Sequence, residues 1–375
     1  MIIPALHLPR TLLASGAIAA LAGELQALNM KRPLLVTDRG VVQAGLAAKV
    51  LTAIGGAASP VVFDGVTENP LFSDVDNGAA LYRRQGCDGV VALGGGSVID
   101  TAKLIALLAA NAGSVANYVG VPAAKFGAGA PLIVVPTTAG TGSEVSASAG
   151  IHPDAQTPSA GMNSRHLVPT IAILDPDLTL SLPPRLTAAT GIDALSHCIE
   201  GYLSRNDVLL AKSIALDGVA LVSRHIRRAV ADGRDAEARS EMMIAAYAGG
   251  VAIGMGLGPA HAVAITCSDQ GFHHGILSGI GLVATLDLTT GHDPGGGREI
   301  AKAFGLNPSE SLTRAIANLM RELGLPATLA EMGYSSKDVD ALAEAAHRSH
   351  FNRSTRYHPT ASEYAAMMNA SLKSR

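Results

Sequence analysis

The sequence predicts an α/β protein in which a doubly wound N-terminal domain is followed by an all-helical C-terminal domain. In the first half, short continuous apolar runs rich in β-branched residues alternate with helical stretches. A proline-rich junction spans residues 174–184, and strand patterns almost vanish after it. Continuous apolar strands separated by helices are typical of a parallel sheet covered on both faces. Such sheets bind ligands at the carboxyl ends of their strands.

The individual elements follow from local patterns, and they place the domain boundary near residue 182, giving domains 1–182 and 183–375. The expected strands are short, apolar and mostly ended by Asp, Gly or Pro: Pro33–Thr37, Pro60–Phe63, Gly89–Leu93, Leu132–Pro136 and Thr170–Leu174. A surface helix is expected where apolar residues recur at helical spacing, at positions 18, 21, 25 and 28. The other expected helices are Ser97–Ala112, Leu186–Leu203, Leu209–Asp232, Ala236–Met255, Ser311–Leu323 and Ser336–His347.

Composition excludes several classes of function. The chain has 375 residues, a net charge of −3 and 48% hydrophobic residues, with no tryptophan. This charge gives no basic surface for nucleic acid or for an anionic membrane. No segment reaches the ~20 apolar residues of a membrane span. The three scattered cysteines do not form a disulfide framework and fit a reducing compartment, so we expect a cytoplasmic protein.

A glycine-rich turn follows the expected strand Gly89–Leu93. Gly94, Gly95, Gly96 and Ser97 lead directly into a helix. Glycines let the backbone approach a ligand closely, and the free N–H groups of the helix would then face a pyrophosphate. We expect Ser97 to cap this helix, with Asp100 completing a capping box. The alternative is a tight turn that binds no ligand.

Two further strand ends carry polar residues. Asp38 follows the first strong strand, where a carboxylate accepts hydrogen bonds from an adenosine ribose and repels a 2′-phosphate, which predicts NAD rather than NADP. The alternative for Asp38 is a plain Asx turn. The hydroxyl- and glycine-rich segment 137–144 follows another strand and either lines a cofactor cleft or satisfies turn backbone groups.

Candidate metal ligands lie in the second half. Asp193 and His197 are spaced i and i+4, so on a helix they share one face. A surface Asp–His ion pair explains this fragment equally well. His261 follows a glycine-rich helix end, and His274 begins another apolar helical stretch. One carboxylate and three imidazoles suit Fe2+ or Zn2+ with a coordination position left open.

These motifs together resemble the iron-containing (group III) alcohol dehydrogenases of the dehydroquinate synthase-like superfamily. They occur in the family's order over nearly the whole chain: GGGSVIDTAK (94–103), PTTAGTGSEVS (136–146), LDPDLTLSLPP (174–184), TAATGIDALSHCIEGY (187–202) and the region of His261 and His274. The resemblance implies a Rossmann-like domain, a helical domain and NAD-linked hydride transfer between a small alcohol and an aldehyde. We also expect a homodimer or a larger homo-oligomer.

The resemblance also implies the residues of the site. The metal ligands, for Fe2+ before Zn2+, are Asp193, His197, His261 and His274. The cofactor contacts are Asp38, Asn69, Gly95, Gly96, Ser97, Thr137, Thr138, Thr141 and Leu178. Many members carry a second histidine four residues after the third ligand, a position that is Ile265 here. His273 is an alternative proton relay, although a histidine beside a ligand is more often a loop residue.

Three alternative functions would share some of these motifs. A cyclase of the dehydroquinate synthase type needs a basic pocket, and residues 140–275 hold few basic side chains. A metal-free maleylacetate reductase is disfavoured because all four ligand positions are filled. A non-catalytic nucleotide- or metal-binding scaffold would bind NADH without turnover.

Overall fold

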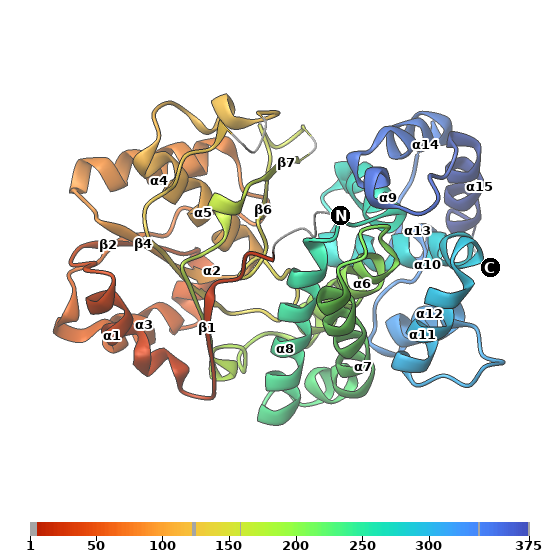
Figure 1. The fold of residues 1–375 in the computed structure, drawn as a ribbon, viewed down its shortest axis with the longest axis horizontal. Helices are drawn as coiled ribbons and strands as arrows, with labels where there is room; N and C mark the ends of the chain where they lie inside the picture. Colours follow the sequence, from red (N-terminus) through yellow and green to blue (C-terminus); the bar gives the residue numbers. More distant parts are fainter. Residues whose placement is uncertain (1–5, 122–124, 158, 337, 374–375) are drawn as a thin grey trace. The chain divides into compact units, whose positions relative to one another are not determined.

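The structure is a computed structural model that describes residues 6–121, 125–157, 159–336 and 338–373 (Figure 1). The chain packs into two compact units. The first contains residues 6–138 and 143–182, and the second contains residues 139–142 and those described from 183 onward.

The first unit is built on a six-stranded parallel sheet with the strand order β1-β8-β5-β4-β2-β3. The strands are β1 (Arg10–Leu13), β2 (Pro33–Val36), β3 (Val61–Phe63), β4 (Gly89–Gly94), β5 (Leu132–Pro136) and β8 (Ile171–Leu174). The helices are α1 (Leu21–Ala27), α2 (Arg39–Gln43), α3 (Leu46–Ile54), α4 (Phe72–Gln85) and α5 (Gly96–Ala110). A separate antiparallel hairpin is formed by β6 (Ser148–Ile151) and β7 (Ala160–Asn163).

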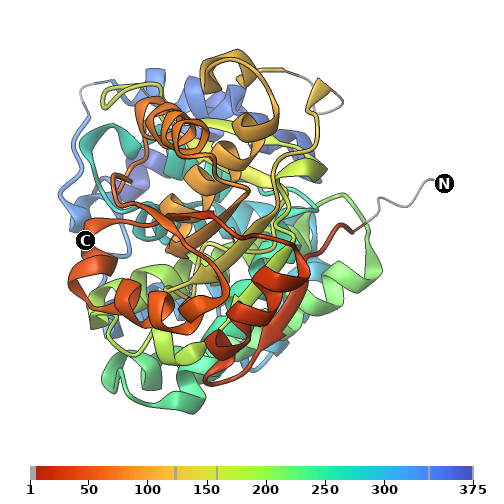
Figure 2. The same ribbon diagram turned by 90° about the vertical axis from the view of Figure 1, so that its left-hand side faces the viewer.

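Helices cover both faces of the sheet, as the continuous apolar strands predict. α1 and α3 pack on one face, where Leu21, Leu25 and Val50 join a buried cluster with Leu35 and Val91 of the strands. α4 and α5 lie on the other face (Figures 1 and 2). The five expected strands are confirmed to within one residue at each end.

The connection order reverses between β2 and β4. From β2 the chain moves outward to β3, then crosses to β4 and continues through β5 to β8 on the other side. At such a switch point the loops after two neighbouring strands leave in opposite directions and open a crevice at their carboxyl ends. The loops that carry Asp38 and the glycine-rich turn follow β2 and β4, so they flank this position.

The helix expected from the apolar residues at 18, 21, 25 and 28 is present as α1, but the segment before it contains a strand that was not expected. Residues 10–13 form the edge strand β1, and the α-helix begins only at Leu21. Its apolar face is buried in the sheet cluster, since Leu21 and Leu25 are fully covered, while Gly23 and Gln26 are exposed, as expected of a surface helix. The strand pairs with β8, which is about 160 residues away in the sequence, so local pattern did not reveal it.

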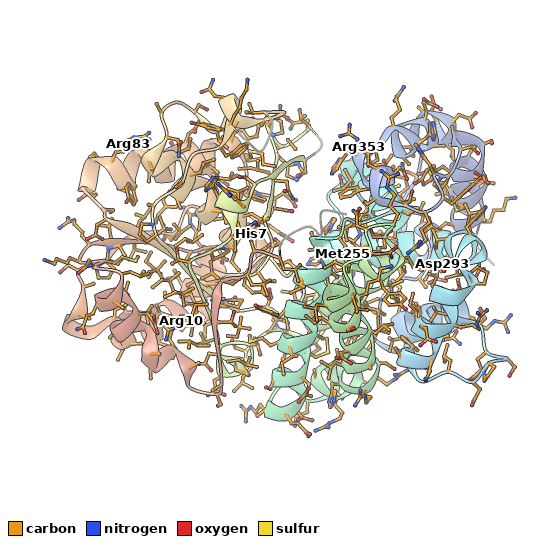
Figure 3. All side chains as sticks on the ribbon, viewed as in Figure 1. His7, Arg10, Arg83, Met255, Asp293 and Arg353 are labelled. Carbon is orange, nitrogen blue, oxygen red and sulfur yellow. The ribbon has the colours of Figure 1, made fainter. Side chains whose placement is uncertain are left out.

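The second unit is helical, and among its described residues no strand longer than an isolated bridge occurs. Its α-helices are α6 (Pro184–Leu203), α7 (Leu209–Ala231), α8 (Ala236–Ile253), α9 (Pro259–Thr266), α10 (His274–His292), α11 (Pro294–Phe304), α12 (Leu312–Glu322), α13 (Leu329–Met332), α14 (Val339–Arg348) and α15 (Ala361–Ser371). α6 is the central helix, buried on all sides from Thr187 to Gly201. Charged side chains such as Arg83 of the first unit and Arg353 of the second are exposed (Figure 3).

Candidate metal centre and cofactor-binding loops

A buried carboxylate at the middle of α6 is surrounded by three imidazoles. Asp193 Oδ1 lies 3.7 Å from His197 Nε2 and 3.9 Å from both His261 Nε2 and His274 Nε2. His197 comes from the same helix, His261 from the first turn of α9, and His274 from the first residue of α10. Residues that are up to 81 positions apart in the sequence are thus brought to one point.

These distances fit donors that share one ion. They are too long for hydrogen bonds, but two donors bound at about 2.1 Å to one ion are separated by no more than about 4.2 Å. One donor atom from each of Asp193, His261 and His274 lies within 4.8 Å of the others, which is a looser limit than that for donors already bound to one ion. His197 stands outside this tightest group, with its ring stacked on that of His261 at a centroid distance of 4.8 Å.

The cluster holds polar atoms that nothing in the described protein satisfies. Within the part of the chain that the structure describes, five buried side-chain polar atoms have no hydrogen-bond partner, and three belong here: Asp193 Oδ1, His197 Nδ1 and His261 Nε2. A buried polar atom without a partner costs about 1–3 kcal/mol. Asp193 is only 2% exposed, so the surface ion pair considered from the sequence is wrong.

Electrostatics favour an ionised aspartate among mostly neutral imidazoles. Burial opposes ionisation of Asp193, but His197, His274 and His261 more than offset it and keep the pKa of that carboxyl below its ordinary value. Burial lowers the pKa of His197 and of His274, against the opposing charge of Asp193. A carboxylate and neutral imidazoles are the protonation states in which these side chains bind a metal ion.

His261 differs from the other two imidazoles because a second carboxylate contacts it. Its Nδ1 lies 2.5 Å from Glu200 Oε2, also on α6. Burial alone would lower the pKa of His261, but the hydrogen bond and charge of Glu200 outweigh it and raise the pKa. The ring of Phe351 also packs against His261, at a centroid distance of 5.8 Å. Glu200 was missed from the sequence, although its i+3 spacing from His197 places it on the same helix face.

His273, the alternative proton relay, caps the helix that begins with His274. Its Nδ1 accepts a hydrogen bond of 3.1 Å from the Gly275 N–H. The cap thus engages Nδ1 of the ring. His274 Nε2 lies 3.3 Å from the Ser278 hydroxyl, one turn along α10.

The glycine-rich turn of the first unit lies at the switch point, but the expected cap is wrong. α5 begins at Gly96 with Gly95 as its N-cap, and no side chain caps it. Ser97 lies inside the first turn and donates its hydroxyl to the Glu68 carbonyl. Asp100 accepts from the Gly150 N–H instead of closing a capping box. The first-turn N–H groups of α5 therefore lack a side-chain cap and suit an anion.

The remaining cofactor candidates follow neighbouring strands of the first unit, with one exception. Asp38 follows β2 and caps α2 by accepting from the Val41 N–H at 2.8 Å, so the Asx turn is present. Thr137 follows β5 and donates its N–H to the Gly94 carbonyl. Beside these, Thr138 also follows β5, Asn69 lies on the exposed loop next to Glu68, and Leu178 follows β8 and is buried in the sheet cluster.

The exception is Thr141, which falls in the second unit with residues 139–142. Gly142 has a φ of +65°, and a Cβ there would lie 2.3 Å from the Gly250 Cα of α8. Only glycine fits such a position. Two of the glycines in this segment thus serve close packing, since a Cβ on Gly140 would meet the Thr190 carbonyl of α6 at 2.5 Å.

Comparisons with known proteins match both units. Residues 9–176 match the family model described as iron-containing alcohol dehydrogenase, and residues 187–372 match the one described as Fe-containing alcohol dehydrogenase family, C-terminal. The chain is 39% identical over 370 residues to a 4-hydroxybutyrate dehydrogenase from Cupriavidus necator, covering 95% of this chain and 96% of that one.

Solved structures agree along the whole chain. A crystal structure of 1,3-propanediol oxidoreductase is similar with a TM-score of 0.94 and 30% identity, covering 99% of this chain and 100% of that one. A sulfoacetaldehyde reductase from Bifidobacterium kashiwanohense, solved in complex with NAD+, is similar with a TM-score of 0.91 and 28% identity, covering 100% of both chains.

Proposed function

Because the chain belongs to the iron-containing alcohol dehydrogenase family, we propose that the cluster around Asp193 is its metal centre and that the loops at the switch point bind NAD. The activity is NAD-linked, metal-dependent oxidation of a small alcohol and the reverse reduction of an aldehyde. The relatives named above are dehydrogenases, oxidoreductases and reductases, so a cyclase is not favoured.

The observation that carries the metal centre is the convergence of four donors on one point, where Asp193 Oδ1 and His261 Nε2 are buried without a hydrogen-bond partner. Asp193, His197, His261 and His274 supply one oxygen and three nitrogens, a set that suits Fe2+ or Zn2+, and the family match favours Fe2+. Bound there, the ion would supply Lewis acidity toward an alcohol or carbonyl oxygen. The protein's own contribution is to hold the four donors rigidly, since three sit on α6 and α9 and are almost fully buried.

The cofactor loops have a complementary role. The uncapped first turn of α5 would hold the pyrophosphate through backbone N–H groups, beside Gly95, Gly96 and Ser97. One oxygen of Asp38 caps α2, and the other would accept from the adenosine ribose. Asn69, Thr137, Thr138, Thr141 and Leu178 are the remaining proposed contacts.

For the proton released on alcohol oxidation we propose His273 as the relay. Its ring is oriented by the hydrogen bond from Gly275, which leaves Nε2 to take up and release the proton. We further propose that residues 1–182 form the NAD-binding domain, that residues 183–375 form the metal-binding domain, and that the protein works in the cytoplasm as a homodimer or larger homo-oligomer. In the part of the chain that the structure describes, no helix is long and apolar enough to cross a bilayer.

The test is metal analysis of the purified protein combined with an NAD-linked activity screen on small alcohols and aldehydes. We expect about one divalent ion per chain, mainly iron when the protein is prepared without oxygen. Asp193→Asn should lower metal content and activity together while NADH still binds. Full activity in the metal-free Asp193→Asn protein would contradict the proposed centre, and NADH binding without turnover of any alcohol would point to a scaffold.

A further inference from the structure

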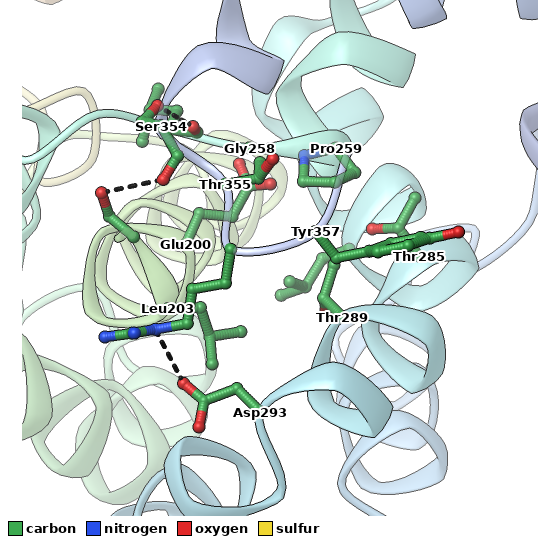
Figure 4. Close-up of a pocket in the computed structure, with 14 residues that line it drawn as sticks. Glu200, Leu203, Gly258, Pro259, Thr285, Thr289, Asp293, Ser354, Thr355 and Tyr357 are labelled. Atoms are coloured by element: carbon green, nitrogen blue, oxygen red, sulfur yellow. Dashed lines mark hydrogen bonds and ion pairs between the residues drawn. The ribbon is translucent and has the colours of Figure 1, made fainter. Parts of the chain in front are cut away.

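Glu200 is a buried carboxylate that the metal centre described above does not use as a ligand. It is 6% exposed and lies on the same face of α6 as His197. Figure 4 shows it at one wall of a small pocket, next to Gly258 and Pro259, with Leu203, Thr289 and Asp293 also lining the pocket. A buried charge is costly unless it is fully hydrogen-bonded, so its partners reveal what it does.

Three hydrogen bonds join its carboxylate to the start of α9. Oε1 accepts from the Ala260 N–H at 2.7 Å, and Oε2 accepts from the His261 N–H at 3.3 Å. These are two of the N–H groups that a helix start leaves without a partner inside the helix. Gly258, the N-cap residue of α9, has no side chain to satisfy them. The carboxylate from α6 therefore takes the place of a side-chain cap.

The third bond goes to the imidazole of His261, whose Nδ1 lies 2.5 Å from Oε2. An ionised carboxylate only accepts, so Nδ1 must carry the proton and donate it. In the neutral ring the lone pair then lies on Nε2, the atom that is buried without a partner and faces Asp193 Oδ1. One carboxylate thus fixes the backbone, the ring orientation and the tautomer of His261.

We propose that Glu200 is a positioning residue that holds His261 in the tautomer and orientation in which it binds the metal ion. This inference rests on the proposed metal centre. Carboxylates that accept from a metal-bound histidine orient the ring and raise its basicity, and their loss typically lowers metal affinity by about 10–100-fold. The competing explanation is that Glu200 merely caps α9, in which case metal binding would be indifferent to it.

Two variants disturb the contact in different ways. Glu200→Gln keeps the shape but leaves one acceptor oxygen for three N–H donors, so either a backbone N–H goes unpaired or the amide NH2 faces Nδ1 and forces the proton onto Nε2. Gly258→Ala changes no polar group, but its Cβ would lie 2.9 Å from Glu200 Oε1 and press the carboxylate away from α9. Thr289→Val is the matched control, because Thr289 lines the same pocket and its hydroxyl bonds the Leu286 carbonyl of its own helix.

The experiment titrates each full-length variant, freed of metal with a chelator, with Co2+ alone. The absorption spectrum of bound Co2+ reports ligand geometry, and NADH binding and circular dichroism report folding. We expect Glu200→Gln to weaken Co2+ binding by about 10–100-fold and to change the spectrum. Gly258→Ala should weaken binding in the same direction, and it carries the test if Glu200→Gln does not fold. Thr289→Val should match the unmodified protein.

His261→Ala distinguishes failure of the proposed metal centre from failure of the positioning role of Glu200. If His261→Ala loses Co2+ while Glu200→Gln keeps the affinity and spectrum of the unmodified protein, Glu200 only caps α9 and the positioning role is overturned, while the metal centre stands. If His261→Ala itself binds Co2+ normally, the proposed metal centre fails, and the positioning role fails with it.

Discussion

Adjacent histidines at the start of α10 should have separable roles, and replacing each by alanine tests this. His274 Nε2 lies 3.9 Å from Asp193 Oδ1, whereas His273 caps the helix through its Nδ1. If four donors share the roughly 10–16 kcal/mol with which structural sites hold Zn2+, one donor accounts for about 3 kcal/mol. This corresponds to a loss of about 100-fold or more in metal affinity for His274→Ala.

His273→Ala should lower the stability of the protein and not its metal affinity. Removing a helix cap costs about 1 kcal/mol of stability, with metal affinity unchanged. The assay is metal content by elemental analysis together with urea unfolding of the metal-free proteins, so that the loss of bound metal does not enter the stability value. If His273→Ala loses the metal and His274→Ala keeps it, the assignment of His274 is shifted by one residue. If neither loses it, the four-ligand site is wrong.

Three further outcomes are expected. NAD(H) should be preferred to NADP(H). Asp38→Gly should reduce the ratio of kcat/KM with NAD(H) to kcat/KM with NADP(H) by roughly fivefold, since the like charges of Asp38 and a 2′-phosphate ~4 Å apart repel by about 1 kcal/mol even in water. Equal kcat/KM values for the two cofactors in the unmodified protein would contradict this role. Gly95→Val should weaken NADH binding greatly while the protein still folds, because it adds a branched side chain where the backbone must approach the pyrophosphate. A folded variant with normal NADH affinity would make the turn purely structural. Burial raises the pKa of Glu144 from 4.5 to about 7, so between these pH values the unfolded chain releases a proton that the folded chain keeps, and the free energy of unfolding falls by about 3 kcal/mol as pH rises. Glu144→Gln should remove this part of the pH dependence of the free energy of unfolding, measured with urea. The same pH dependence in the variant and the unmodified protein would refute this.

The sequence predicted those parts of the fold that have a clear local pattern of residues. The strands Leu132–Pro136 and Gly89–Gly94 are continuous apolar runs, and the pattern defines them because both faces are buried. β1 and the β6–β7 hairpin were missed because β1 depends on a distant partner and the hairpin consists of small residues such as those of Ser148–Ile151. Ser97 was assigned as a cap from its residue type, but the strand continues to Gly94 and the helix starts at Gly96, two residues earlier than a cap at Ser97 requires.

In the candidate site, too, local spacing was predictable and tertiary packing was not. The spacing of Asp193 and His197 predicted that they share a face, but their burial depends on the helices packed around α6. That His261 and His274 lie beside them is a tertiary fact, because α9 and α10 follow loops whose course the sequence does not specify. Glu200 was missed because a carboxylate on a helix gives no local sign that it caps a different helix.

The packing of Phe351 against His261 offers a practical optical probe. The chain contains no tryptophan, so Phe351→Trp would give it a single indole emitter placed directly beside the imidazole. Excitation selective for indole would then report on that one location without background from the rest of the chain. A paramagnetic ion a few ångströms from the indole would quench its light, so filling of the centre could be followed in real time during a single mixing experiment.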